Sequence, residues 1–192
     1  MVSSDSSPRV LLLPGWQNSG PEHWQSRWEQ RYGYTRVQQH DWQRPLRGDW
    51  SIQLQEAVLD SAQPVVLVAH SLGCILTAWW AAHSPLAQTK VHAALLVAPG
   101  DVEQSDLRQV LPGWAPVLLQ RLPFPTVVVA SHNDPYCSAE RAQTMAKAWG
   151  ARLVDAGAVG HINSDSGLED WDAGHALLQK LMKEQRHGDE ET

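Results

Sequence analysis

Short, mostly apolar runs that alternate with helical patterns are the feature that most constrains how this chain can fold. Six such runs are expected to be strands: residues 10–13, 35–38, 65–69, 91–97, 126–130 and 152–155. Strands separated by single helices favour a parallel sheet with right-handed crossover connections. Because most of these runs are continuously apolar, the sheet should be buried on both faces. We therefore predict an α/β protein, a three-layer α/β/α sandwich around a six-stranded parallel sheet.

The segments between the runs carry the helix signals. Helices are predicted over residues 21–31, 51–61, 72–83, 139–149 and 170–182. Residues 101–122 are amphipathic, but Pro112, Gly113 and Pro116 interrupt them, so one regular helix is not expected there. Residues 157–167 are expected to form a loop.

The length of 192 residues suits one domain. We assign that domain to residues 9–182, with a flexible stretch at 1–8 and a charged, disordered tail at 183–192. A net charge of −6 without a basic stripe argues against nucleic acid as a partner. The apolar runs are far shorter than the ~20 residues of a membrane-spanning helix. Two cysteines give no disulfide framework, so a cytoplasmic location is expected.

The pentapeptide Ala69-His70-Ser71-Leu72-Gly73 lies between an apolar run and a helical pattern. A strand, a sharp turn that carries serine and then a helix expose the serine hydroxyl as a nucleophile. Small residues are needed two positions before and after the serine, because strand and helix backbones approach closely there. Gly73 meets this need, and Ala69 adds only a methyl group.

In a parallel sheet, ligands bind beyond the carboxyl ends of the strands, so polar residues that follow the other strands are candidates for the partners of Ser71. Asp134 and His161 complete the chain order Ser, Asp, His that is typical of this geometry. Asp101 is the main rival for the acid, since it follows the neighbouring strand, and Asp155 is a weaker one. His70, next to the nucleophile, is expected to be a packed or hydrogen-bonded structural residue.

A serine hydroxyl needs a base to take its proton, and a carboxylate orients the imidazole that does so. The backbone N–H groups of Leu72 and Trp16 are the candidate donors to a developing oxyanion. Most of the ten Trp residues should fill the core, while Trp16 and Trp114 are candidates to line an apolar substrate pocket. With no H-x-x-x-H or C-x-x-C spacing in the chain, neither a metal nor another cofactor is predicted.

These motifs resemble the α/β-hydrolase superfamily, and more narrowly the small serine hydrolases of the retinoblastoma-binding protein 9 type. The matching motifs are Leu13-Pro14-Gly15-Trp16, Ala69-His70-Ser71-Leu72-Gly73, Asn133-Asp134-Pro135-Tyr136 and Gly160-His161-Ile162-Asn163. The resemblance spans residues 9–182. It implies a hydrolase fold that lacks the first two strands of larger relatives, a strand order of 2-1-3-4-5-6 and the triad Ser71, Asp134 and His161. The L-x-C-x-E docking motif for the protein partner in that name is incomplete at residues 72–76, so no such partner is inferred.

We therefore expect a serine hydrolase of the esterase type, which cleaves small acyl esters or related acyl compounds through an acyl-enzyme on Ser71. Two alternatives stay open at this point. An acyltransferase or thioesterase would use the same triad, and a catalytically weak binding protein would keep only the fold.

Overall fold

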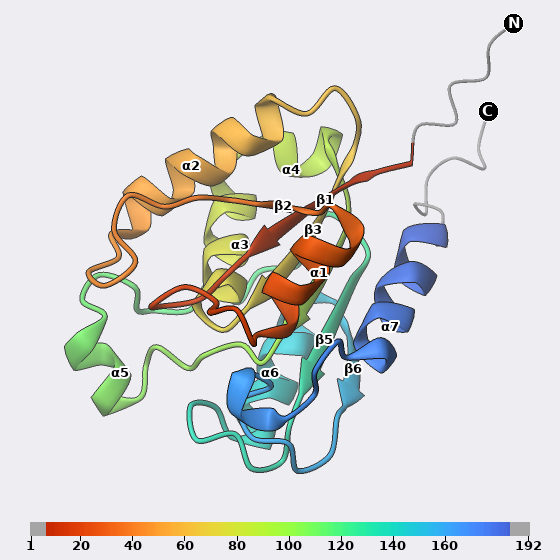
Figure 1. The fold of residues 1–192 in the computed structure, drawn as a ribbon. Helices are drawn as coiled ribbons and strands as arrows, with labels where there is room; N and C mark the ends of the chain where they lie inside the picture. Colours follow the sequence, from red (N-terminus) through yellow and green to blue (C-terminus); the bar gives the residue numbers. More distant parts are fainter. Residues whose placement is uncertain (1–6, 185–192) are drawn as a thin grey trace, which may run out of the picture.

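Six parallel strands form one sheet in the order β2-β1-β3-β4-β5-β6 (Figure 1). They are β1 (Arg9–Leu13), β2 (Thr35–Arg36), β3 (Val65–His70), β4 (Val91–Val97), β5 (Thr126–Ala130) and β6 (Arg152–Asp155). This computed structural model describes residues 7–184. The predicted fold class and strand order are confirmed.

Helices cover both faces of the sheet, because successive strand residues point to opposite sides and both sides are apolar. The helices are α1 (Trp24–Tyr32), α2 (Arg47–Leu59), α3 (Leu72–His83), α4 (Leu86–Thr89), α5 (Ser105–Val110), α6 (Ala139–Trp149) and α7 (Asp172–Lys183). One core joins α2, α3, α5 and α6 to strand residues such as Leu67 and Leu96. The other core joins α1 and α7 to strand residues such as Val66 and Leu95. The sheet is thus the middle layer of three (Figure 1).

Several predicted elements have the observed bounds, namely α3, α6, β4, β5 and β6. The start of α2 was predicted at residue 51, but the helix begins at Arg47. Its first turn contains Gly48, which reads as a loop signal in sequence. The turn forms because Trp50 packs into the core against the ring of Trp114, at a centroid distance of 5.4 Å.

The predicted start of α1 at residue 21 was also wrong, because the helix begins after His23. The side chain of His23 accepts the N–H of Gln25 and so acts as the N-cap. The short helix α4 was not predicted, whereas the interrupted segment 101–122 does contain only α5. The expectations for residues 1–6 and 185–192 lie outside the described residues, while Lys183 ends α7.

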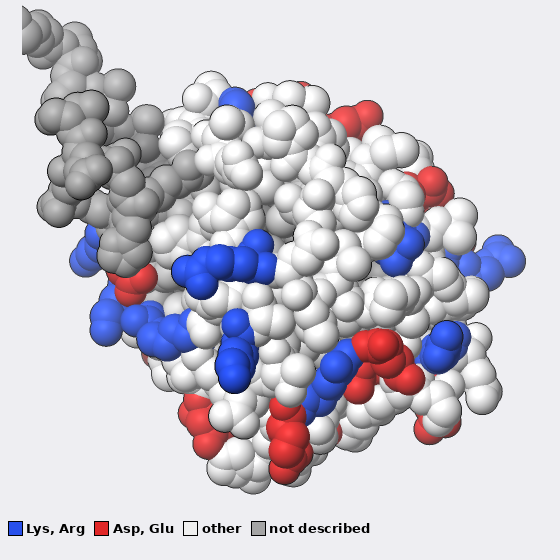
Figure 2. All heavy atoms as spheres, turned by 180° about the vertical axis from the view of Figure 1, so that it is seen from behind, with Lys and Arg blue, Asp and Glu red and all other residues white. Residues whose placement is uncertain are grey.

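The charged side chains on the face drawn in Figure 2 include both signs, with Lys and Arg interspersed with Asp and Glu rather than gathered into one stripe. Much of this face carries no charge at all. Across residues 7–184, none of the helices is both long and apolar enough to cross a lipid bilayer.

Candidate active site

Ser71 occupies the sharp turn between β3 and α3, with a φ of 52° and a ψ of −116°. A positive φ is strained for a non-glycine residue, and such strain is often found at functional sites. The turn is held on both sides, because the Ser71 N–H donates to Val97 O at 3.0 Å and the Ser71 carbonyl accepts from Cys74 N–H at 3.0 Å. The serine therefore stands at the carboxyl edge of the sheet.

Close backbone approach explains the small residues around the turn. A Cβ atom on Gly73 would lie 2.3 Å from the carbonyl oxygen of Leu13, and one on Gly15 would lie 2.9 Å from Ser71 Cβ. Both distances are shorter than real Cβ contacts, so β1 approaches α3 closely only because residue 73 is glycine, and the turn after β1 approaches Ser71 closely only because residue 15 is glycine. The methyl group of Ala69, by contrast, is accommodated in the core.

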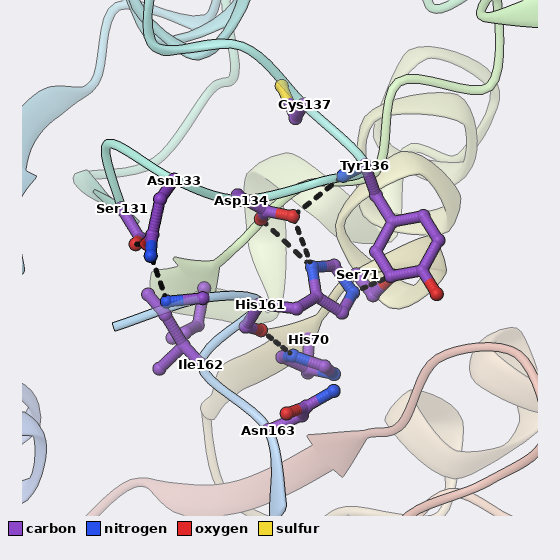
Figure 3. A network of polar contacts seen from close by, with 12 residues as sticks. His70, Ser71, Ser131, Asn133, Asp134, Tyr136, Cys137, His161, Ile162 and Asn163 are labelled. Carbon is purple, nitrogen blue, oxygen red and sulfur yellow. Dashed lines mark hydrogen bonds and ion pairs between the residues drawn. The ribbon is translucent and has the colours of Figure 1, made fainter. Parts of the chain in front are cut away.

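A hydrogen-bonded chain runs from Ser71 through His161 to Asp134 (Figure 3). The Ser71 Oγ atom is 2.9 Å from His161 Nε2, and His161 Nδ1 is 2.9 Å from each carboxylate oxygen of Asp134. The side chain of Asp134 is only 3% exposed. Because the carboxylate accepts the Nδ1 proton, it presents the unprotonated Nε2 to the serine hydroxyl.

The rival acids do not reach His161. Asp101 forms an ion pair with Arg141, with a distance of 3.4 Å between Asp101 Oδ1 and Arg141 Nε. Asp155 pairs with His132 at the surface. Both carboxylates thus stabilise neighbouring segments, and only Asp134 among the three lies against the imidazole.

Three side chains hold the backbone of the loop that carries His161. Ser131 Oγ accepts the N–H of Val159 at 3.0 Å, and Asn133 Oδ1 accepts the N–H of Gly160 at 2.7 Å. His70 Nε2 donates to the carbonyl oxygen of His161 at 2.9 Å (Figure 3). His70 and Ser71, which are adjacent in the chain, therefore contact the backbone and the side chain of the same histidine.

Sequence reasoning did not assign a site role to Asn133 or Tyr136. The Tyr136 ring packs edge-on against the His161 ring at 4.6 Å, and its backbone N–H donates to Asp134 at 2.9 Å. The sequence feature that could have indicated a site role for them is their position, because both residues follow β5 and lie within two residues of Asp134.

Two further histidines are buried beside the chain. Burial lowers the pKa of His70 well below its ordinary range. Burial, helped by Arg36 and His161, also lowers the pKa of His23 to about 3. The two rings pack edge-on, with centroids 4.7 Å apart, and both are neutral at physiological pH.

The two backbone N–H groups expected to donate to an oxyanion, those of Leu72 and Trp16, have no backbone acceptor of their own among the described residues. Leu72 is the first residue of α3, so its N–H has no acceptor within the helix. In the turn after β1, the N–H groups of Gln17 and Asn18 donate to Trp42 O and Gly15 O. Among the described residues, the Trp16 N–H has no backbone acceptor.

A cavity of about 310 Å³ opens over Ser71 and His161. Trp16 lines it, as expected from the sequence, but Trp114 does not. Trp114 is fully buried in the core, and its indole N–H donates to Pro45 O at 2.9 Å. The expectation for Trp114 was wrong because the segment around α5 turns this side chain inward. Val102, Leu107 and Leu111 of the same segment line the cavity instead.

Neither cysteine is suited to be the nucleophile. Both thiols are free and buried, and burial raises the pKa of Cys137 to about 12 and that of Cys74 well above its ordinary range. Within residues 7–184 there is also no group of three or more His, Cys, Asp and Glu side chains placed to hold a metal ion.

Comparison with known proteins gives a match to the model of the serine hydrolase family over residues 10–180. A YdeN-like hydrolase from Pectobacterium atrosepticum is 31% identical, with a TM-score of 0.81 over 92% of this chain and 91% of that chain. The ydeN gene product of B. subtilis is 20% identical, with a TM-score of 0.77 over 92% and 100%. Est1E from Butyrivibrio proteoclasticus, solved with ferulic acid, is 13% identical with a TM-score of 0.68 over 92% and 90%. No curated protein sequence matches the chain.

Proposed function

Since the chain belongs to the serine hydrolase family, we propose that it hydrolyses small acyl esters through a covalent intermediate on Ser71. The observation that carries this proposal is the unbroken chain of 2.9 Å contacts from Ser71 Oγ through His161 to Asp134. The four motifs shared with the retinoblastoma-binding protein 9 type support that narrower likeness as part of the same proposal.

In the proposed first half-reaction, His161 Nε2 takes the proton of Ser71 as Oγ attacks the ester carbonyl. The charge that develops on the carbonyl oxygen is stabilised by the N–H groups of Leu72 and Trp16. The imidazolium is stabilised by Asp134 and returns its proton to the departing alcohol. This step leaves the acyl group on Ser71.

In the second half-reaction, water takes the place of the alcohol. His161 removes a proton from water as its oxygen attacks the acyl carbonyl, and the same proton returns to Ser71 Oγ when the acid leaves. Every proton is carried by His161, so the reaction as proposed needs no cofactor.

Kinetics of Ser71→Ala test this proposal directly. Removal of a triad nucleophile costs on the order of 10⁶ in rate, so turnover of p-nitrophenyl butyrate should fall to background. A fluorophosphonate probe should label the wild type at Ser71 and leave the variant unlabelled. Ser105→Ala, a change at an exposed serine in α5, is the control and should keep both activities. Turnover that survives in Ser71→Ala, or labelling at a different serine, would contradict the mechanism.

The same experiment separates the alternatives. A binding protein with a weak site would neither label nor turn over ester, and a transferase would pass the acyl group to an added alcohol faster than to water. A cytoplasmic location is also part of the proposal, and the two free buried thiols of Cys74 and Cys137 support it.

A further inference from the structure

The cavity over Ser71 has two walls of different chemistry. Val102, Leu107 and Leu111 line it from the core that contains α2, α3 and α6. Asn18 and His23 line it from the segment between β1 and α1, and Asn163 and Asp165 from the segment between β6 and α7. One wall is therefore aliphatic and the other polar, and the proposed nucleophile lies between them.

His23 brings a buried donor without a partner to the polar wall. Its Nδ1 atom accepts the N–H of Gln25 at 3.1 Å, so the proton of the neutral ring is on Nε2. Nε2 is buried and no described residue accepts its hydrogen bond, and His23 itself lines the cavity. The whole residue is only 4% exposed. A buried donor without an acceptor is costly, which indicates that it serves a group that the chain itself does not provide.

The two asparagines of the polar wall also have N–H groups to donate, because their side-chain oxygens already accept hydrogen bonds from the protein. Asn18 Oδ1 accepts from Ser19 N–H at 2.8 Å and from Arg36 at 2.8 Å. Asn163 Oδ1 accepts from Asp165 N–H at 3.1 Å. Because the carbonyl oxygens are engaged, each side chain has its NH₂ group left to offer. Asn163 lines the same cavity as His70 and follows His161 by two residues on the loop drawn in Figure 3.

The charge of the wall decides which acceptors fit these donors. Of the described residues that line the cavity, none is Lys or Arg, and Asp165 is the one carboxylate beside the donors. Within residues 7–184, Asp165 forms no ion pair. An anionic ligand would meet Asp165 without a compensating cation. A hydroxyl group suits both kinds of partner, because it accepts from an N–H and donates to a carboxylate.

We propose that the substrates are esters between a short aliphatic acid and a neutral, hydroxyl-rich alcohol such as a polyol or a sugar, with His23, Asn18 and Asn163 as the residues that select the alcohol. The aliphatic acyl chain lies against Val102, Leu107 and Leu111. A cavity of about 310 Å³ is at the small end of ligand sites, which limits the acyl chain to a few carbons. This inference rests on the proposed hydrolase function of Ser71.

Two esters that share one acyl group test the inference. The esters 1-butyrylglycerol and propyl butyrate both have a three-carbon alcohol, but only the first carries free hydroxyl groups. Hydrolysis is followed by acid release at constant pH, with p-nitrophenyl butyrate as the measure of general activity. We expect the wild-type kcat/KM to be about tenfold higher for 1-butyrylglycerol, the factor that one or two hydrogen bonds supply.

Two variants remove single donors while they keep the structural hydrogen bonds. His23→Asn retains an N-cap acceptor for α1, and Asn163→Asp retains the acceptor for the Asp165 N–H. Each should lower the ratio of the two kcat/KM values about threefold, since each removes one of the hydrogen bonds that together give the tenfold preference. Gln143→Glu adds a charge on the exposed side of α6, outside the cavity, and should leave the ratio at the wild-type value. Far-ultraviolet circular dichroism verifies that each variant is folded.

A wild-type ratio of one or less, or a ratio that neither variant changes, would overturn the inference while the hydrolase proposal stands. If p-nitrophenyl butyrate is not hydrolysed either, the proposed function itself fails and the inference fails with it.

Discussion

Substitution of Gly73 by alanine probes the closest contact in the nucleophile turn. The new Cβ atom would lie 2.3 Å from the carbonyl oxygen of Leu13, and 3.1 Å from its carbonyl carbon and from Pro14 O. Real Cβ atoms are essentially never closer than 3.0 Å, so the two backbones must separate by about 0.7 Å. Because all three contacts are backbone atoms, no side-chain rotation can relieve them. Such overpacking costs about 1–3 kcal/mol, and we expect about 2 kcal/mol.

The same displacement should reach the active site. Gly15 follows Leu13 and Pro14, and it packs directly against Ser71, so movement of this turn shifts the Trp16 N–H relative to the serine. A displacement of ~1 Å in a catalytic group can cost ~10²-fold in rate, so we expect kcat to fall about 10-fold to 100-fold.

Gly48→Ala is a matched control, because Gly48 is also the second residue of its helix and has no atom within 4 Å of an added Cβ. It should stabilise the protein by a few tenths of a kcal/mol, up to about 1 kcal/mol, through helix propensity. Urea unfolding gives the two free energies, and p-nitrophenyl butyrate gives the rates. Equal stability of the two variants would refute the close-approach argument.

Three further predictions follow from the site. Asp134→Asn should lower kcat for ester hydrolysis about 10⁴-fold, because the histidine then adopts the wrong tautomer. Asp101→Asn should stay near the wild-type rate. The reverse ranking of the two variants would identify Asp101 as the acid of the triad. The pKa of His23 is about 3 in the folded protein and about 6.5 in the unfolded chain. As the pH drops, the unfolded chain therefore binds this proton before the folded protein does, and the free energy of unfolding falls between about pH 6.5 and pH 3. At pH 5 the loss from this group is about 2 kcal/mol relative to pH 7, and urea unfolding of His23→Asn should show a correspondingly shallower acid decline. His70→Leu should lower kcat about 10-fold to 100-fold with little change in KM. His70→Gln keeps an N–H donor and should recover most of the lost kcat. Equal losses of kcat in both variants would mean that the hydrogen bond to His161 O does not contribute to the rate.

The elements with strong local signals were predictable from the sequence. The bounds of β4 and β5 are set by continuous apolar runs, and those of α6 by Ser138 as the N-cap and Gly150 in the left-handed conformation at the end. Asp134 and His161 could be chosen because residues after parallel strands gather at one edge of the sheet. Local pattern and topology together therefore located the candidate residues.

Contacts between distant segments were not predictable in the same way. Nothing local distinguishes Trp16, which lines the cavity, from Trp114, which fills the core. The partner of His70 is the carbonyl oxygen of a residue 91 positions away. Every residue has a backbone carbonyl oxygen, so the sequence does not indicate which one His70 contacts. The start of α2 depends likewise on the distant packing of Trp50. Contacts between segments far apart in the sequence decided each of these cases.

The pairing of β1 with β3 has a consequence for how the protein folds. Arg9 pairs with Val65, and β5 and β6 add at the far side of the sheet, so the fold is dominated by contacts between residues far apart in sequence. High contact order slows folding, since long loops must close before these contacts form. His161 follows β6, the last strand along the chain, so an incomplete nascent chain holds Ser71 without its base. Recovery of ester hydrolysis after dilution from denaturant should therefore coincide with completion of the native fold and not precede it.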